Sequence, residues 1–147
     1  MVIDILKLKQ EAGMTSHFLF EYEAKDDLLA LPDAHFRGNV ILEGDASLVG
    51  KDLFVEMIVR YVVDCPCSRC LEPAQAKVEY PFSVKYTLFP EEDAYLYKSG
   101  RADLTSAADE AILLSQPTVV YCKPDCKGLC PVCGANLNNT DCGHDIY

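Results

Sequence analysis

The eight cysteines gather in two clusters whose spacing is typical of metal-binding knuckles. The upstream cluster is Cys65-Pro66-Cys67-Ser68-Arg69-Cys70, and the downstream cluster runs from Cys122 to Cys142. Each contains a C-x-x-C turn, in which both sulfurs point into one concavity and can hold zinc at about 2.3 Å in a tetrahedron. Cys130-Pro131-Val132-Cys133-Gly134 is the strongest instance, because proline sets the φ angle of the turn and glycine lets the backbone curl toward the sulfur.

The spacing leaves two groupings of these ligands open. In one, Cys126, Cys130, Cys133 and Cys142 fold as a single compact knuckle. In the other, Cys67 and Cys70 join two downstream cysteines, as in a zinc ribbon built from distant hairpins. Cys122 and His144 are spare ligands in either scheme, and two four-coordinate sites can be filled. The predicted metal ligands are Cys67, Cys70, Cys122, Cys126, Cys130, Cys133, Cys142 and His144. We expect structural zinc, because a catalytic zinc keeps an open position and usually has His or carboxylate ligands.

Three other interpretations of the cysteines are disulfides, reduced residues of a loop and redox-active pairs. The N-terminus carries charge throughout and has no signal-peptide pattern, so we expect a cytoplasmic protein in a reducing compartment, where structural disulfides are rare. A thioredoxin-type C-x-x-C lies at the N-terminus of a helix, and no helical pattern follows Cys70 or Cys133. The spacing therefore favours metal binding.

The charge of the chain limits its partners. Acidic residues outnumber basic ones by 23 to 13, which gives a net charge of -10. Lys and Arg neutralise phosphates, so an acidic chain is a poor non-specific binder of nucleic acid, and we expect no DNA partner. A basic partner such as a ribosomal protein fits better. Arg69, Lys123 and Lys127 would form only a small phosphate-contacting face. No apolar run approaches the 20 or so residues of a membrane span, so we expect no membrane partner.

The elements that must position the cysteines are mostly strands. Lys77 to Leu88 is the clearest, because apolar and polar residues alternate along its whole length, and Pro81 places it at a sheet edge. Leu53 to Val63 predicts a long, well-buried strand that delivers Cys67 and Cys70 to the tip of a β-hairpin. Further predictions are a short helix or strand at 3–11, strands at 16–23 and 39–49 with a bulge or kink at Gly44, a turn at 50–52, a loop at 89–103, a helix from 105 or 106 to about 115, and a short strand at 118–121.

The predicted fold class is α+β, mostly antiparallel β as a sheet or partly open barrel, with one or two short helices. Residues 1–121 are expected to form a β-rich core domain with Cys67 and Cys70 at a hairpin tip. Residues 122–147 are expected to form a cysteine-rich zinc-knuckle segment packed on that domain. This segment is too short and too rich in Gly, Pro and Asn to have its own core. Within it, Gly128 and Asn138 are expected to supply positive φ angles.

The run from Asp125 to Asn138, preceded by Cys67-Ser68-Arg69-Cys70-Leu71, resembles the YceD family. Its bacterial and plastid members are linked to accumulation of large-subunit ribosomal RNA. The resemblance covers essentially the whole chain and implies a mostly β domain with a role in ribosome biogenesis rather than a known reaction. Members with this fuller cysteine set often end in C-x-C. Here His144, which is also an acceptable zinc ligand, takes the place of the last cysteine.

The resemblance and the residues together predict a bacterial, non-enzymatic ribosome-biogenesis factor that contains structural zinc. Its expected partner is a ribosomal protein or a large-subunit rRNA precursor. One alternative is an acidic module that binds a basic ribosomal protein without touching RNA. A second is a thiol- or metal-dependent enzyme, although the chain contains no G-x-S-x-G, P-loop or G-x-G-x-x-G motif. No catalytic residue is therefore predicted.

Overall fold

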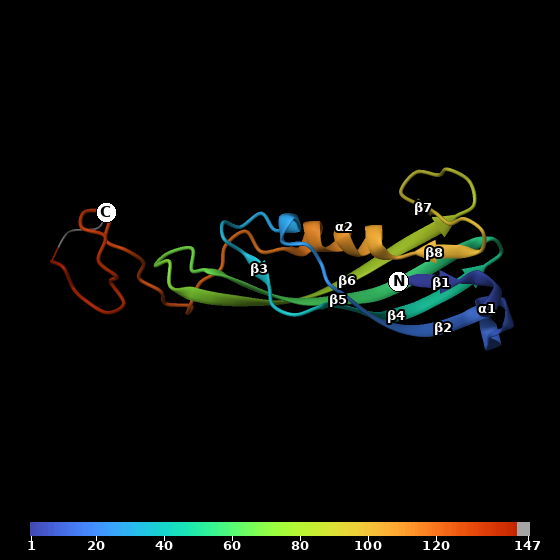
Figure 1. The fold of residues 1–147 in the computed structure, drawn as a ribbon, viewed down its shortest axis with the longest axis horizontal. Helices are drawn as coiled ribbons and strands as arrows, with labels where there is room; N and C mark the ends of the chain where they lie inside the picture. The colour runs from blue at the N-terminus through green and yellow to red at the C-terminus, as the bar shows by residue number, and fades with distance from the viewer. Residues whose placement is uncertain (144–147) are drawn as a thin grey trace.

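A computed structural model describes residues 1–143 of the chain, and its main element is an open six-stranded sheet (Figure 1). The strand order is β2–β4–β5–β6–β7, and β3 pairs with β5 beside this path. All neighbours are antiparallel except β6 and β7. The strands are β2 (Thr15–Tyr22), β3 (His35–Phe36), β4 (Val40–Val49), β5 (Asp52–Pro66), β6 (Pro73–Thr87) and β7 (Tyr95–Leu96). The predicted mainly antiparallel α+β class is confirmed, as an open sheet rather than a barrel.

Shorter elements close one end of this sheet. Strands β1 (Val2–Asp4) and β8 (Arg101–Asp103) form a two-stranded sheet of their own. Two 3-10 turns, η1 (Ala12–Met14) and η2 (Asp26–Leu28), flank β2. The helices are α1 (Ile5–Gln10), which Asp4 caps through the N–H groups of Leu6 and Lys7, and α2 (Thr105–Ser115). Neither helix has the length or the apolar run that crossing a membrane would require, within the residues described.

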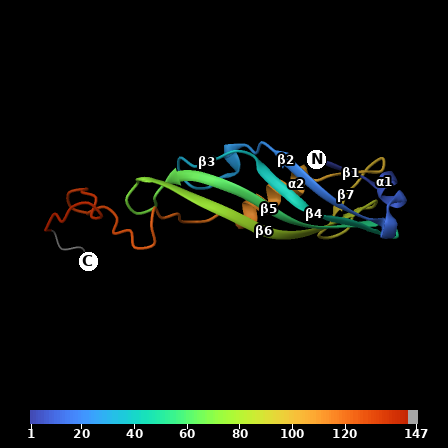
Figure 2. The same ribbon diagram turned by 90° about the horizontal axis from the view of Figure 1, so that it is seen from below.

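The β5–β6 hairpin sets the length of the molecule and positions the cysteines. Its register runs unbroken from Leu53 opposite Tyr86 to Pro66 opposite Pro73. The tip of the hairpin holds Cys67 to Cys70, as predicted, and the C-terminal segment lies beyond that tip in both ribbon views (Figures 1 and 2). A long antiparallel pair is stiff, so the first two cysteines stand on a fixed platform at one end of the protein.

Helix α2 covers one face of the sheet and leaves the other face open (Figure 1). Its inner side packs on the sheet, since Ala107, Ala108, Ala111 and Ile112 are fully buried. The long strand predicted at 53–63 forms as β5, and its alternate residues face the core. Val55 and Val59 are fully buried, whereas Phe54 and Ile58 point to the open face and are exposed. Because apolar residues occupy both faces of β5, the sequence lacks the alternation of polar and apolar residues that would indicate an open face.

Gly44 is needed for close approach and not for a bulge. The register of β4 and β5 passes through Gly44 opposite Met57 without an extra residue. A Cβ atom at this position would lie 2.0 Å from the carbonyl oxygen of Glu56 and 2.6 Å from the Cα of Met57. The predicted bulge is therefore wrong, and the missing side chain lets the two backbones touch.

Other predictions differ from the structure near the strand ends. The expected loop at 89–103 contains β7 and β8, which are too short to show a period. The expected strand at 118–121 does not form. Pro81 does lie on a free edge, because β6 pairs with β7 only through Tyr86 and Thr87. Its missing N–H therefore leaves no ladder bond unmade.

Candidate metal centres

The first cysteine cluster, which we call site A, comprises Cys67, Cys70, Cys122 and Cys126. The four Sγ atoms all lie within 4.8 Å of one another. The sulfurs of Cys67 and Cys126 are 3.7 Å apart, and those of Cys70 and Cys122 are 3.5 Å apart. A tetrahedral site with metal–sulfur bonds of about 2.3 Å has sulfur–sulfur edges of about 3.8 Å. The four thiols therefore fit a tetrahedral metal ion, and all are free cysteines.

Backbone hydrogen bonds bring the two halves of site A together. The N–H of Ser68 donates to the carbonyl of Val120 at 2.7 Å, and the N–H of Val120 donates to the Ser68 hydroxyl at 3.0 Å. This reciprocal pair fixes the chain two residues before Cys122 against the hairpin tip. The tip itself is closed by the Cys67 N–H, which donates to the carbonyl of Glu72 at 2.7 Å. Residues 118–121 thus dock on the knuckle in place of forming the predicted strand.

Arg69 clamps the same junction from the side. Its guanidinium donates to the carbonyl of Cys126 at 2.9 Å and lies 4.3 Å over the ring of Tyr121. Both contacts join the hairpin tip to the downstream segment. The sequence suggested Arg69 as a phosphate contact, but the structure uses its planar group to hold the metal-ligand segment.

Amide N–H groups surround the site A sulfurs and favour the thiolate forms. Burial raises the pKa of Cys67, but the N–H groups of Cys70, Arg69 and Cys122 outweigh it and lower this pKa to about 6. The side-chain amide of Asn138 donates to Cys126 Sγ at 3.3 Å and holds the pKa of Cys126 below its usual range. By contrast, the neighbouring sulfur of Cys70 raises the pKa of Cys122 to about 12. Four close thiolates repel one another, so full deprotonation requires a cation between them.

The second cluster, which we call site B, comprises Cys130, Cys133 and Cys142. Their Sγ atoms also lie within 4.8 Å of one another. The N–H of Val132 donates to Cys130 Sγ at 3.4 Å, and the N–H of Gly134 donates to the Cys130 carbonyl at 2.8 Å. Gly134 has a φ of 76°, which completes the predicted knuckle turn. The N–H of Cys133, with that of Val132, lowers the pKa of Cys130 to about 6 against the effect of burial.

The structure therefore separates the predicted ligands into two groups. It places Cys67 and Cys70 with Cys122 and Cys126, which corresponds to the ribbon-like scheme. It does not place Cys126 with the three later cysteines, so the compact four-cysteine knuckle does not form. The spare residue Cys122 is a full member of site A. His144, the other spare ligand, lies outside the described residues.

Cys65 belongs to neither site, although it is only two residues from Cys67. It lies on the inner face of β5, within the main core, where burial raises the pKa of its thiol. Cys67 lies beyond the strand end, where the chain turns, and is packed with Cys70 and Cys126 in a separate buried cluster. Period two would place both side chains on the same face, so the end of β5 at Pro66 accounts for the difference.

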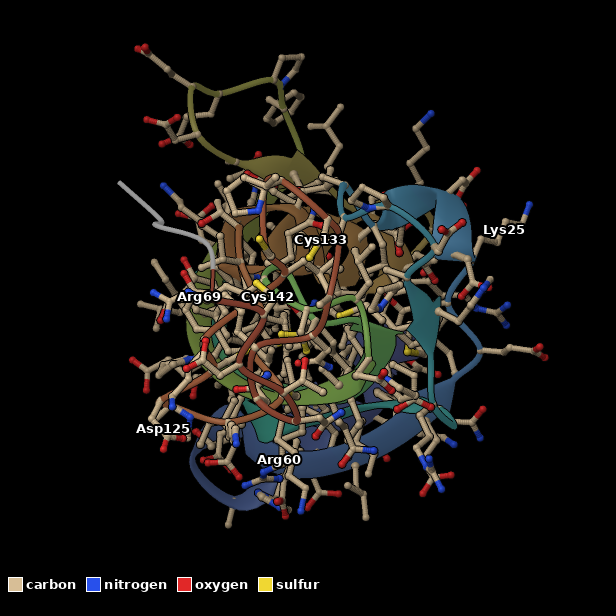
Figure 3. The ribbon with its side chains drawn as sticks, turned by 90° about the vertical axis from the view of Figure 1, so that its left-hand side faces the viewer. Lys25, Arg60, Arg69, Asp125, Cys133 and Cys142 are labelled. Atoms are coloured by element: carbon tan, nitrogen blue, oxygen red, sulfur yellow. The ribbon has the colours of Figure 1, made fainter. Side chains whose placement is uncertain are left out.

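The two sites differ in their exposure to solvent. Cys67, Cys70 and Cys126 of site A are buried, and only Cys122 is exposed. In site B, Cys133 is exposed and Cys142 is half-buried. Figure 3 looks onto this end of the molecule, where Cys133 and Cys142 lie in the C-terminal segment and Arg69 lies beside them in projection. Site B is therefore the more accessible of the two.

The aromatic residues near the acidic loop fold back onto the domain. The Tyr97 side chain is buried and donates to the carbonyl of Lys51. The ring of Tyr95 stacks on Tyr86 at 5.5 Å between centroids, and its hydroxyl bonds Glu110. The structure assigns them to packing.

The match to a known protein family spans both cysteine clusters. The model of the family described as "Large ribosomal RNA subunit accumulation protein YceD" matches residues 55–146. An uncharacterized protein of Mycobacterium tuberculosis is 29% identical over 154 residues, which cover 93% of this chain and 70% of that protein. The chloroplastic "Large ribosomal RNA subunit accumulation protein YCED homolog 1" of Zea mays is 29% identical over 143 residues, 71% of this chain and 47% of that protein. No solved structure matches the chain significantly.

Proposed function

This chain belongs to the YceD family, and from that premise we propose that it is a cytoplasmic, non-enzymatic ribosome-biogenesis factor. It supports accumulation of large-subunit ribosomal RNA, and two zinc ions hold its C-terminal segment. Site A binds one ion through Cys67, Cys70, Cys122 and Cys126. Site B binds the other through Cys130, Cys133, Cys142 and His144. The four converging sulfurs of site A are the observation that carries the metal assignment.

The proposed zinc is structural, because site A offers four thiolates and no open position. Tetrahedral sulfur sites select zinc or iron–sulfur chemistry, and closed all-cysteine sites are typical of structural zinc. The segment after Cys122 is poor in core residues, since Cys126, Gly128 and Cys130 are its buried positions among the residues described. Structural zinc contributes about 10–16 kcal/mol in apparent terms, which is enough to order such a segment.

On this proposal the chain has a body, residues 1–121, and a metal-held C-terminal segment, residues 122–147. From Cys122 onward two lysines oppose three aspartates, which gives -1 and leaves -9 of the total -10 on the body. Because the C-terminal segment has a net charge near zero, RNA can approach it with the least repulsion. The acidic body suits a basic ribosomal protein, so either the rRNA precursor or such a protein is the partner.

A second candidate function, binding of a basic protein without RNA contact, is favoured by the open face of the sheet. Asp45 of β4 and Glu56 of β5 lie directly opposite each other there, and both are exposed. Like charges at opposed positions destabilise a sheet. His17 bonds Asp45 at 3.0 Å and relieves part of this repulsion. A basic partner on that face would relieve the rest.

Gradient sedimentation of cell extracts tests the proposed function. The wild-type chain is expected to sediment with large-subunit precursors, and its deletion is expected to lower large-subunit rRNA. The Cys67→Ser/Cys126→Ser variant loses site A and is expected to leave those fractions, whereas the matched variant Cys65→Ser remains in them. Absence of the wild-type chain from all precursor fractions, together with normal rRNA after deletion, would rule the function out. Asp45→Asn/Glu56→Gln separates the second candidate, because it weakens salt-dependent binding to a basic ribosomal protein only if the open face is the contact.

A further inference from the structure

Asn138 joins the two candidate metal sites through one side-chain amide. It lies in the loop between Cys133 and Cys142, both of which belong to site B. Its Oδ1 accepts from the backbone N–H of Lys127 at 2.9 Å, and its Nδ2 donates to Cys126 Sγ of site A at 3.3 Å. The Lys127 N–H can only donate, so it fixes which end of the amide faces it. The NH₂ group must then face the sulfur.

A small backbone framework carries Asn138 to this position. Leu129 pairs with Asn136 as an antiparallel bridge, and the N–H of Leu137 donates to the carbonyl of Gly128 at 2.9 Å. The side chain of Asn136 accepts from the Asn138 N–H at 3.0 Å. The predicted positive φ at Asn138 is not observed, although Gly128 has one of 78°. Asn138 therefore acts through its side chain and not through an unusual backbone.

Gly128 fixes where this framework meets the hairpin tip. A Cβ atom on Gly128 would lie 3.4 Å from the carbonyl oxygen of Arg69, which is van der Waals contact. The backbone at Gly128 therefore lies against the site A knuckle, and the bridge from Leu129 to Asn136 holds the segment that carries Asn138 beside it. The loop between Cys133 and Cys142 is bounded at both ends by site B cysteines and is held at its middle by these bonds.

We propose that Asn138 is a positioning residue that couples the two metal sites, so that filling site B raises the metal affinity of site A. This rests on the metal sites of the proposed function. A metal ion at site B fixes both ends of the loop and so holds the amide on Cys126. An N–H group directed at a ligand sulfur stabilises the metal-bound thiolate, and changes to such outer partners typically cost about 10–100-fold in metal affinity. By linkage, filling site A raises the affinity of site B by the same factor.

Cobalt(II) titration of the full reduced chain tests the coupling, because thiolate–cobalt absorption reports each site directly. The site A affinity is measured with site B intact and with site B disabled by Cys133→Ser/Cys142→Ser. We expect disabling site B to weaken cobalt binding at site A about tenfold or more. Asn138→Asp keeps the acceptor for Lys127 but replaces the donor with an oxygen that repels Cys126. In the Asn138→Asp variant we expect site A to bind cobalt weakly even when site B is intact. Disabling site B should then lower the site A affinity no further.

Asn139→Asp is the matched control, since Asn139 is the exposed next residue and adds the same charge. It should leave both the site A affinity and the coupling unchanged. If Asn138→Asp binds no cobalt at site A, Asn138→Ala removes the side-chain donor without adding charge and permits the same comparison. Equal site A affinity with and without site B would overturn the proposal. So would a coupling that persists unchanged in both Asn138 variants. Failure of the wild-type chain to bind any metal would instead remove the metal sites themselves.

Discussion

Cys67 and Cys126 are 59 residues apart in the chain, yet their sulfurs lie 3.7 Å from each other. The β5–β6 hairpin carries the first, and the segment after α2 carries the second. Because Cys67 ends a stiff strand pair, the proposed metal fixes the direction in which the downstream segment leaves the body. Site A is thus a junction between a rigid hairpin and a segment that has little core of its own.

The first prediction concerns metal stoichiometry. Native mass spectrometry of the reduced wild-type chain is expected to show two bound zinc ions. Cys70→Ser/Cys122→Ser removes two opposed ligands of site A and should leave one ion or none, because the coupling through Asn138 also weakens site B. Cys65→Ser, a change in the main core, should retain both. Two ions bound to the Cys70/Cys122 variant would show that these sulfurs are not ligands.

The second prediction concerns the Arg69 clamp. Arg69→Gln removes both the bond to the Cys126 carbonyl and the stacking on Tyr121. We expect zinc binding at site A to weaken about tenfold, the lower end of the range for outer-shell changes. Competition with a chromophoric chelator measures it. Lys123→Gln loses the same charge on the same exposed surface and should bind zinc as the wild type does. An equal effect of the two changes would mean that Arg69 acts only through its charge.

The third prediction concerns Gly44 and the stability of the sheet. Gly44→Ala places a methyl group against the Glu56 carbonyl, so the strands must separate, and we expect a loss of about 3 kcal/mol or more. Urea denaturation followed by far-UV circular dichroism gives the value. Gly38→Ala is the control, because nothing lies within 4 Å of its Cβ position and only its φ of 77° is unfavourable. That change should cost about 1–2 kcal/mol. Gly44 itself has no positive φ, so a loss no larger than that of Gly38→Ala would mean that the strands accommodate the methyl group without separating.

The sequence predicts most of the elements here because their signals are local. Alternation along 77–88 gives β6, and Pro117 ends the pattern of α2. The C-x-x-C spacing likewise identifies the knuckles at Cys67 and Cys130. What the sequence leaves open depends on contacts between distant segments.

The grouping of the ligands is the main example of such a contact. Cys122 and Cys126 belong with the hairpin tip because the Ser68 N–H and hydroxyl bond the backbone of Val120, and no spacing rule contains those bonds. The sequence gives at most a weak signal for the role of Asn138, because it shows only an asparagine among the eight residues between Cys133 and Cys142. The very short strands β7 and β8 depend on distant partners, since β7 pairs with the edge of β6 and β8 pairs with β1.

The fourth prediction concerns the pH dependence of His17. Its ring lies 3.0 Å from Asp45 and 3.2 Å from Glu43, and these bonds raise the pKa of His17 above its ordinary value of 6.5. The folded state therefore prefers protonated His17. Its contribution to stability is complete below about pH 6.5 and is lost as the pH rises through the raised folded-state pKa. An NMR titration of the imidazole should show the raised value. Asp45→Asn should lower it, and a pKa that does not change in this variant would contradict the assignment.

The last prediction follows from the unequal exposure of the two sites. Cys133 of site B is exposed, whereas Cys67 and Cys126 of site A are 0% and 2% exposed. A chelator removes zinc either by reaching the ion directly or after the site opens locally. We therefore expect zinc to leave in two phases, first from site B and then from site A. Cys133→Ser/Cys142→Ser should abolish the fast phase. Its remaining slow phase should also be faster than in the wild type, because the Asn138 loop has lost its anchors. Release of both zinc ions in a single phase would mean that the two sites open together. A slow phase with an unchanged rate in the variant would mean that site A does not depend on site B.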